Sequence, residues 1–220
     1  MEISKQLKWF LWASPIFVLA FTRICIELSI ELFQSEISWI PAFIAYYISI
    51  AVIIIIAVRF FHLPLANKIS FSLIPVPKIK LLFLGIIIPA LLPIAAFITQ
   101  SKFVPPIFFL YIIIFSIINS IFEEGYWRGL LTFLPVSNAM RTLFSATLFS
   151  FSHFLFWEYW YKTPMVMIPT VISTFIMGVL YMWFMNKKKN LLYPILSHII
   201  VDILNLSVAV YAGIVTPDKF

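Results

Sequence analysis

Residues 103–127, FVPPIFFLYIIIFSIINSIFEEGYW, decide the fold. This stretch is an almost unbroken apolar run, and about 20 apolar residues of helix are enough to cross the hydrocarbon core of a bilayer, which is about 30 Å thick. The run ends in two adjacent carboxylates, Glu123 and Glu124. Ionisable groups on a membrane helix are costly, so the stretch predicts both a lipid environment and a polar site at the end of the helix.

The rest of the chain has the same character. Apolar residues make up 63% of the 220 positions and charged residues 11%, against about 45–50% and about 25% in ordinary soluble domains. A soluble protein of this size could not bury so much apolar surface. The formal charge of +6 does not indicate a nucleic-acid partner, because the basic residues are scattered between apolar runs and form no patch.

Apolar segments of helix length recur along the whole chain and predict an all-α, polytopic integral membrane protein, a single membrane domain over 1–220. Between the second and third segments, the connection 59–80 is expected to lie on the membrane surface. Proline residues at 89 and 93 should kink the third segment and open room for a cavity. About seven transmembrane helices are expected, at 7–30, 37–58, 81–100, 103–127, 141–160, 164–186 and 191–214.

The distribution of basic residues predicts how the helices are oriented. Eleven Lys and Arg residues, Arg128 among them, fall in the loops on one side of this seven-helix arrangement, and four fall on the other. Cytoplasmic loops carry the excess of basic residues. We therefore expect a multi-pass protein of the cell membrane with its N-terminus in the cytoplasm and its C-terminus outside.

Polar residues interrupt three of the segments. At the end of the fourth segment, Glu124 and the following Arg128 are four residues apart and can pair, while Glu123 faces a polar stripe that includes Asn119. The alternative to a functional site is that Glu123 and Glu124 are two solvated carboxylates at a helix end. His153 lies in the fifth segment, where a lone histidine is often only a packing residue.

The seventh segment carries the strongest single signal, His198 followed one turn later by Asp202. An aspartate within an apolar run needs a partner or a proton. Taken together, the carboxylates and imidazoles of the three segments suit hydrolysis. A glutamate can take a proton from water, while imidazoles orient that water and stabilise an oxyanion.

Three ordered motifs resemble those of the CPBP family of intramembrane proteases, which includes CAAX prenyl endopeptidases and bacterial relatives linked to bacteriocin processing and immunity. The motifs are Glu123-Glu124-x-x-x-Arg128-Gly129, Phe149-x-x-x-His153 and His198-x-x-x-Asp202, and the resemblance covers 104–205. It implies the following roles: Glu123 as general base, His153 in positioning water, His198 and Asp202 at the oxyanion, and Glu124 and Arg128 as supporting residues.

Two points stay open within this resemblance. The last motif often ends in Asn, and here Asp202 is either protonated or orients His198. Glu123, His153 and His198 also resemble a His₂Glu zinc site. Their ligands would come from three helices, without the compact His-Glu-x-x-His pairing that pre-forms such a site. The expectation is therefore catalysis without a metal or other cofactor, with zinc as the alternative.

The resemblance implies an intramembrane endopeptidase, a CAAX-protease-like hydrolase, that cleaves a membrane-embedded or lipidated peptide or protein near the cytoplasmic face. The expected partners are this substrate and the lipid bilayer. Two other functions are compatible with the sequence. One is a non-catalytic immunity or scaffold protein, although Glu123, His153 and His198 are all present. The other is a proton-coupled transporter, although such proteins usually contain internal repeats and none is apparent.

Overall fold

The structure is a computed structural model that describes residues 4–33, 37–65, 69–71, 87–91, 93–160 and 164–214. Over these residues it is helical and contains no strand beyond one isolated bridge between Ser70 and Asn190. The all-α prediction is confirmed. The long helices are α1 (Lys5–Leu32), α2 (Trp39–Arg59), α7 (Pro106–Glu124), α8 (Asn138–Trp160), α9 (Pro164–Lys188) and α10 (Leu192–Leu204). Shorter pieces are α5 (Ile88–Leu91), α6 (Ile94–Gln100), η2 (Ser101–Phe103), η3 (Gly125–Gly129), η4 (Leu130–Phe133) and α11 (Ser207–Tyr211).

The number of membrane spans is not confirmed at seven. Among the described residues, four helical stretches are long and apolar enough to cross a bilayer: Lys5–Leu32, Trp39–Arg59, Pro106–Phe133 and Met167–Lys188. Helix α10 is apolar but has only 13 residues, which corresponds to about 20 Å of helix. The third expected span is broken into α5 and α6, and its residues 81–86 and 92 lie outside the described part, as does most of the connection 59–80.

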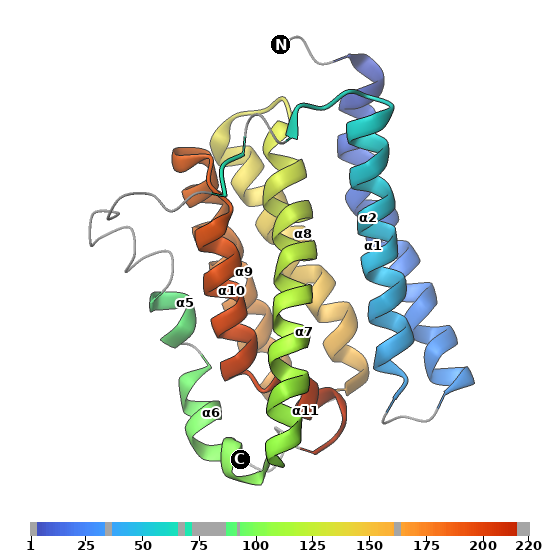
Figure 1. Cartoon of the computed structure of the whole chain (residues 1–220). Helices are drawn as coiled ribbons and strands as arrows, with labels where there is room; N and C mark the ends of the chain where they lie inside the picture. The colour runs from blue at the N-terminus through green and yellow to red at the C-terminus, as the bar shows by residue number, and fades with distance from the viewer. Residues whose placement is uncertain are drawn as a thin grey trace.

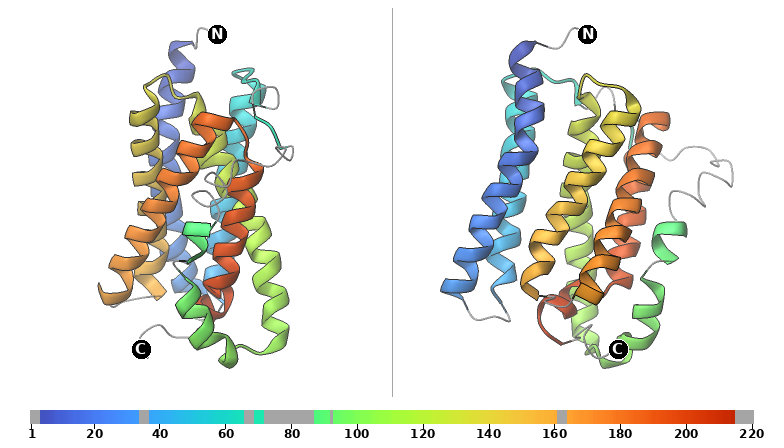
Figure 2. Two further views of the ribbon diagram at one scale, coloured as in Figure 1. Left: turned by 90° about the vertical axis from the view of Figure 1, so that its left-hand side faces the viewer. Right: turned by 180° about the vertical axis from the view of Figure 1, so that it is seen from behind.

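The helices form a bundle in which the site-bearing helices are central. Helices α1 and α2 pack together at one edge, α5 and α6 lie at the opposite edge, and α7 to α10 lie between them (Figures 1 and 2). Helix α7 packs against α10, and α8 packs against α9 over most of its length. The start of α1 and the end of α9 lie at one end of the bundle, and α11 lies at the other (Figure 1).

The outer surface of this bundle suits lipid. Large apolar side chains are exposed along α1, α2 and α7, and on α7 they include Ile107, Leu110 and Ile121. Soluble proteins rarely expose contiguous apolar patches of more than a few hundred square ångströms. With four apolar helices of membrane-spanning length, this surface makes the chain a membrane protein.

Local sequence explains where the helices begin. The Ser4 hydroxyl accepts a hydrogen bond from the backbone N–H of Leu7 at 3.2 Å and caps α1. Helix α7 begins with Pro106, whose missing N–H costs nothing in the first turn. Toward the far end of α1, Arg23 pairs with Glu27 at 2.7 Å and with Glu158 of α8 at 2.6 Å.

The fourth segment was predicted to end at residue 127, and the structure differs there. The helical path continues past Glu124 through a π-helical turn, η3, and a 3₁₀ turn, η4, to Phe133. π-helical turns occur often at functional sites, because they shift side chains relative to a regular helix. Glu123 and Glu124 therefore lie inside a 28-residue span and not at its end. Arg128, counted above as a loop residue, is fully buried, which leaves ten basic residues on that side.

The last predicted helix, 191–214, is also interrupted. Helix α10 ends at Leu204, and Leu206 has a φ of +54°, a left-handed conformation that is unfavourable for a branched apolar residue. Helix α11 then begins at Ser207, whose hydroxyl donates to the backbone carbonyl of Asp202 at 3.1 Å. This break turns α11 toward α7, with which it packs.

Helices α8 and α9 approach each other closely at Gly178. A Cβ atom built at Gly178 would lie 2.9 Å from the Cα atom of Ala146, a distance that only a glycine permits. Small residues allow membrane helices to approach closely. The approach brings Thr174 within hydrogen-bond distance of Ser150, at 3.1 Å.

We therefore expect Gly178→Ala to lower the stability of the bundle, because the added methyl group meets backbone and not a movable side chain. Overpacking of this kind costs about 1–3 kcal/mol. Gly125→Ala is the matched control, since its Cβ would lie 3.9 Å from the flexible Ile54 side chain. Thermal unfolding in detergent measures both variants. Equal melting temperatures for Gly178→Ala and the wild type would contradict this packing.

Candidate active site

The acidic pair at the end of α7 is buried. Glu123 is 3% exposed and Glu124 is 0% exposed, so the interpretation as solvated carboxylates at a helix end is wrong. A buried carboxylate must be hydrogen-bonded or paired. The two glutamates meet this requirement with different partners.

Glu123 is surrounded by polar groups from four helices. Its Oε1 accepts a hydrogen bond from the Tyr46 hydroxyl of α2 at 2.9 Å, and its Oε2 accepts one from the Asn119 amide at 3.4 Å. The Nε2 atoms of His198 and His153 lie 3.6 Å and 3.8 Å from the same Oε2. The structure thus brings together the three residues that sequence analysis placed on three separate segments.

Both imidazoles are held by their Nδ1 atoms. Nδ1 of His198 lies 2.8 Å from Oε1 of Glu124, and Nδ1 of His153 lies 2.9 Å from the backbone carbonyl of Phe149. Both partners are acceptors, so each neutral ring carries its proton on Nδ1 and presents a lone pair at Nε2. Nε2 of His198 is buried and has no hydrogen-bond partner among the described residues.

Glu124 joins Arg128 to the site. The predicted pair is present, with Nη1 of Arg128 3.1 Å from Oε1 of Glu124, and both side chains are fully buried. The guanidinium also lies over the Phe149 ring, 3.9 Å from its centroid. The face of an aromatic ring attracts a cation in this position. Phe149 in turn contacts the ring of His153 at 4.4 Å between centroids.

Asp202 belongs to the same cluster through Asn119. Its Oδ2 accepts a hydrogen bond from the Asn119 amide at 2.9 Å, whereas its Oδ1 lies 3.6 Å from Nε2 of His198, beyond hydrogen-bond distance. Glu124, and not Asp202, therefore makes the hydrogen bond that orients His198. Asn119 links the carboxylates of α7 and α10.

A cavity of about 330 Å³ opens beside these groups. One water molecule needs about 10–15 Å³ of such volume, so the cavity has room for water and for part of a substrate. The third segment, which the prolines were expected to kink and which is broken into α5 and α6, contributes to the cavity, because Pro89 and Pro93 are in its wall. The site residues that line it are Asn119, Glu123, His153, His198 and Asp202, with Phe43, Phe115, Phe156, Trp157 and Tyr211 forming an aromatic wall.

Tyr46 and Tyr47 were not predicted from the sequence, and Asn119 was expected only as part of the polar stripe that Glu123 faces. Tyr47 donates to Oδ1 of Asn119 at 2.9 Å, so α2 contacts the site through two consecutive hydroxyls. Tyrosines of membrane helices usually lie at the membrane–water interfaces. A pair of tyrosines in the interior of the apolar segment 37–58 was the available signal.

The same cluster provides a possible metal-ligand set. One ligand atom each of Glu123, His153 and His198 lies within 4.8 Å of the others. Histidines that bind zinc usually donate their second N–H to a carboxylate or a backbone carbonyl, and Glu124 and the Phe149 carbonyl occupy these positions. The donor set and its supporting hydrogen bonds fit a zinc ion.

Comparison with protein families connects this geometry to a known group. A family model described as type II CAAX prenyl endopeptidase Rce1-like matches residues 105–204. The match confirms the resemblance to CPBP intramembrane proteases over less than half of the chain. No curated protein matches the chain, and no solved structure matches it.

We expect Glu124→Gln to destabilise the fold, because it leaves Arg128 buried without its anionic partner. Removing one partner of a buried ion pair costs about 3–5 kcal/mol. Thermal unfolding in detergent should show a clear loss. Glu27→Gln is the control, since Glu27 pairs with Arg23 at a half-exposed site, where ion pairs contribute little. If the two variants unfold at the same temperature, the buried pair has no structural role.

Proposed function

We propose that this membrane protein, with its Rce1-like region at residues 105–204, is an intramembrane endopeptidase that uses Glu123 to activate water. One observation carries the proposal. Oε2 of Glu123 and the Nε2 atoms of His153 and His198 converge beside one cavity inside the helix bundle. A general base, two imidazoles and space for water are the parts that peptide hydrolysis requires.

In the proposed reaction Glu123 acts as general base. Its carboxylate takes a proton from a water molecule while the water oxygen bonds to the carbonyl carbon of the scissile peptide. The Nε2 atoms of His153 and His198, 3.8 Å and 3.6 Å from Oε2, are placed to orient that water. The C–N bond then breaks, and the proton on Glu123 passes to the leaving amine. The products are a carboxylic acid and an amine.

The negative charge that develops on the carbonyl oxygen needs a nearby donor or cation. His198 becomes such a group when it is protonated, and Glu124 stabilises its positive charge. Asp202 is held by Asn119 at the edge of the cavity and completes the polar lining. If Glu123, His153 and His198 held a zinc ion, the ion would supply Lewis acidity at the same place.

The substrate is expected to be a membrane-embedded or lipidated peptide or protein. The cavity is enclosed by membrane helices and has an aromatic wall beside its polar groups, so an apolar segment can lie there next to the peptide bond that is cut. Because Rce1-like proteins are CAAX prenyl endopeptidases by description, a peptide with an S-farnesylated CAAX box is the first probe to test.

We further propose a multi-pass protein of the cell membrane with a cytoplasmic N-terminus and an external C-terminus. The start of α1 and the ends of α2 and α9 share one end of the bundle (Figure 1) and carry Lys5, Lys8, Arg59, Lys187 and Lys188. Along the helical path, Glu123 lies roughly 15 Å from that end and roughly 25 Å from the start of α7. This position supports cleavage nearer the cytoplasmic face.

Glu123→Gln should abolish cleavage of the farnesylated probe and leave the protein folded, because it removes the base and keeps the shape of the side chain. Loss of a general base lowers kcat by about 10²–10⁴-fold. Release of fluorescence from a quenched version of the probe measures turnover by the purified protein. Glu27→Gln, on the outer face of α1, is the control and should retain activity. Cleavage by Glu123→Gln at the wild-type rate would show that another group is the base.

Metal dependence is tested separately. We expect extensive dialysis against a chelator to leave activity intact, and metal analysis to find well below one zinc ion per chain. If instead activity is lost on dialysis and returns with one equivalent of zinc, Glu123, His153 and His198 act as ligands. Metal content is measured on the same samples, so the ligand question has a readout that does not depend on turnover.

A further inference from the structure

Helix α2 lies outside the matched residues 105–204, yet it contributes a direct partner of the catalytic glutamate. The Tyr46 hydroxyl donates a hydrogen bond to Oε1 of Glu123 at 2.9 Å. Tyr46 is 0% exposed and Glu123 is 3% exposed, so water does not compete for this hydrogen bond. Hydrogen bonds to an ionised acceptor are stronger than those between neutral groups.

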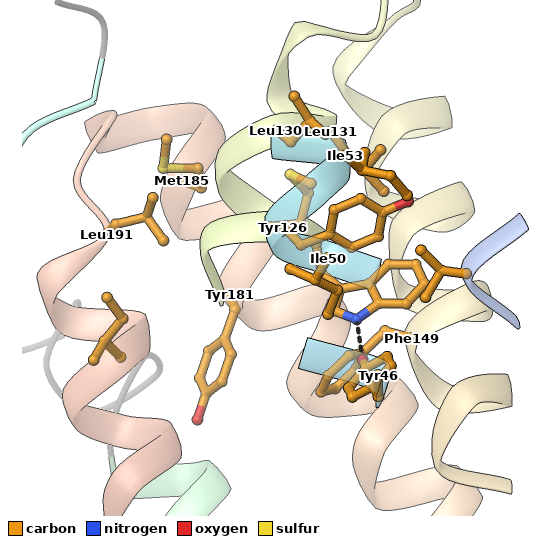
Figure 3. Packing of buried hydrophobic residues seen from close by; sticks show 14 of the residues in the cluster. Tyr46, Ile50, Ile53, Tyr126, Leu130, Leu131, Phe149, Tyr181, Met185 and Leu191 are labelled. Carbon is orange, nitrogen blue, oxygen red and sulfur yellow. Dashed lines mark hydrogen bonds between the residues drawn. The ribbon is translucent and has the colours of Figure 1, made fainter. Parts of the chain in front are cut away.

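The direction of this hydrogen bond is fixed by a second one. Nε1 of Trp127 lies 3.0 Å from the Tyr46 oxygen, and this contact is the dashed line that ends on Tyr46 in Figure 3. An indole N–H can only donate, so the Tyr46 oxygen is the acceptor. The single proton of the Tyr46 hydroxyl is therefore available for Glu123. Trp127 is fully buried, which holds this chain of two hydrogen bonds in place.

These two hydrogen bonds give the two oxygens of Glu123 different roles. Oε1 is occupied by Tyr46. Oε2 faces the two imidazole Nε2 atoms at 3.6 Å and 3.8 Å, on the side where water can lie. Resting on the function proposed above, we propose that Tyr46 is a positioning residue that fixes the rotamer of Glu123, so that Oε2 is the oxygen that takes the proton from water.

The next residue on α2, Tyr47, acts on Oε2 of Glu123 indirectly, through Asn119. Tyr47 donates to Oδ1 of Asn119 at 2.9 Å, so the Asn119 amide must turn its NH₂ group toward the carboxylates. That NH₂ group contacts Oε2 of Glu123 at 3.4 Å and Oδ2 of Asp202 at 2.9 Å. Two consecutive tyrosines of α2 therefore set the orientation of two polar groups on α7.

The test compares Tyr46→Phe with Tyr126→Phe in the full-length protein, with the quenched farnesylated peptide as probe. Each variant removes one buried hydroxyl, but the Tyr126 hydroxyl donates to Ser14 and does not contact the site. Since a general base contributes about 10²–10⁴-fold, loss of its orientation should lower kcat about 10–100-fold in Tyr46→Phe. KM should stay within about twofold, because the interaction acts on the reacting state and not on substrate binding. Tyr126→Phe should keep the wild-type kcat, while both variants lose similar thermal stability.

A double-mutant cycle with Trp127→Phe tests the coupling. If Trp127 acts through Tyr46, adding Trp127→Phe to Tyr46→Phe should lower kcat no further. If the two substitutions together lower kcat by the product of their separate effects, Trp127 does not act through Tyr46. Equal kcat values for Tyr46→Phe and Tyr126→Phe would overturn the positioning role of Tyr46. Glu123→Gln is measured in parallel. If its turnover equals that of the wild type, Glu123 is not the base, and this inference fails together with that part of the proposed function. If it is inactive while Tyr46→Phe is fully active, only the inference fails.

Discussion

Two carboxylates on one membrane helix have to be compensated where they stand, and the rest of the structure follows from this constraint. Lipid offers no hydrogen bonds, so a buried carboxylate needs partners from the protein. Arg128 and His198 serve Glu124, and hydroxyl, amide and imidazole groups surround Glu123. Asn119 and Arg128 lie on the same helical path as the two glutamates, and the other partners come from α2, α8 and α10, which places those helices around the end of α7.

The difference between the two glutamates follows from their partners. Glu124 is in direct contact with cationic or protonated groups, which makes it a structural anion. Glu123 accepts a hydrogen bond from a neutral donor at each oxygen, Tyr46 at Oε1 and Asn119 at Oε2, and it lines the cavity. A carboxylate that is held by neutral hydrogen bonds can gain and lose a proton without breaking an ion pair. The geometry thus separates a group that stabilises the fold from a group that can do chemistry.

Sequence patterns predicted the helical fold and the residues that meet in the site, because an ionisable side chain in an apolar run is conspicuous and its spacing is read directly. Glu123, His153 and His198 were identified in this way, and the pairing of Glu124 with Arg128 followed from helical geometry. The patterns could not predict how far the helix continues after Glu124, since Gly125 and Arg128 resemble the end of a span. Here a π-helical turn and tertiary burial override the local signal. Tyr46 escaped notice because a tyrosine is itself largely apolar, and only the folded chain shows that its hydroxyl meets a carboxylate.

The contact from α2 also bears on what counts as a module in this protein. Residues 105–204 are the part that resembles a family, but they do not contain the donors to Oε1 of Glu123 and Oδ1 of Asn119. A recombinant fragment or a chimera cut at those limits would carry every acidic and imidazole group of the site and would still lack two of its hydroxyls. The residues that contact the site therefore extend beyond the region of recognisable similarity, and a chimera should take α2 and α7 from the same protein.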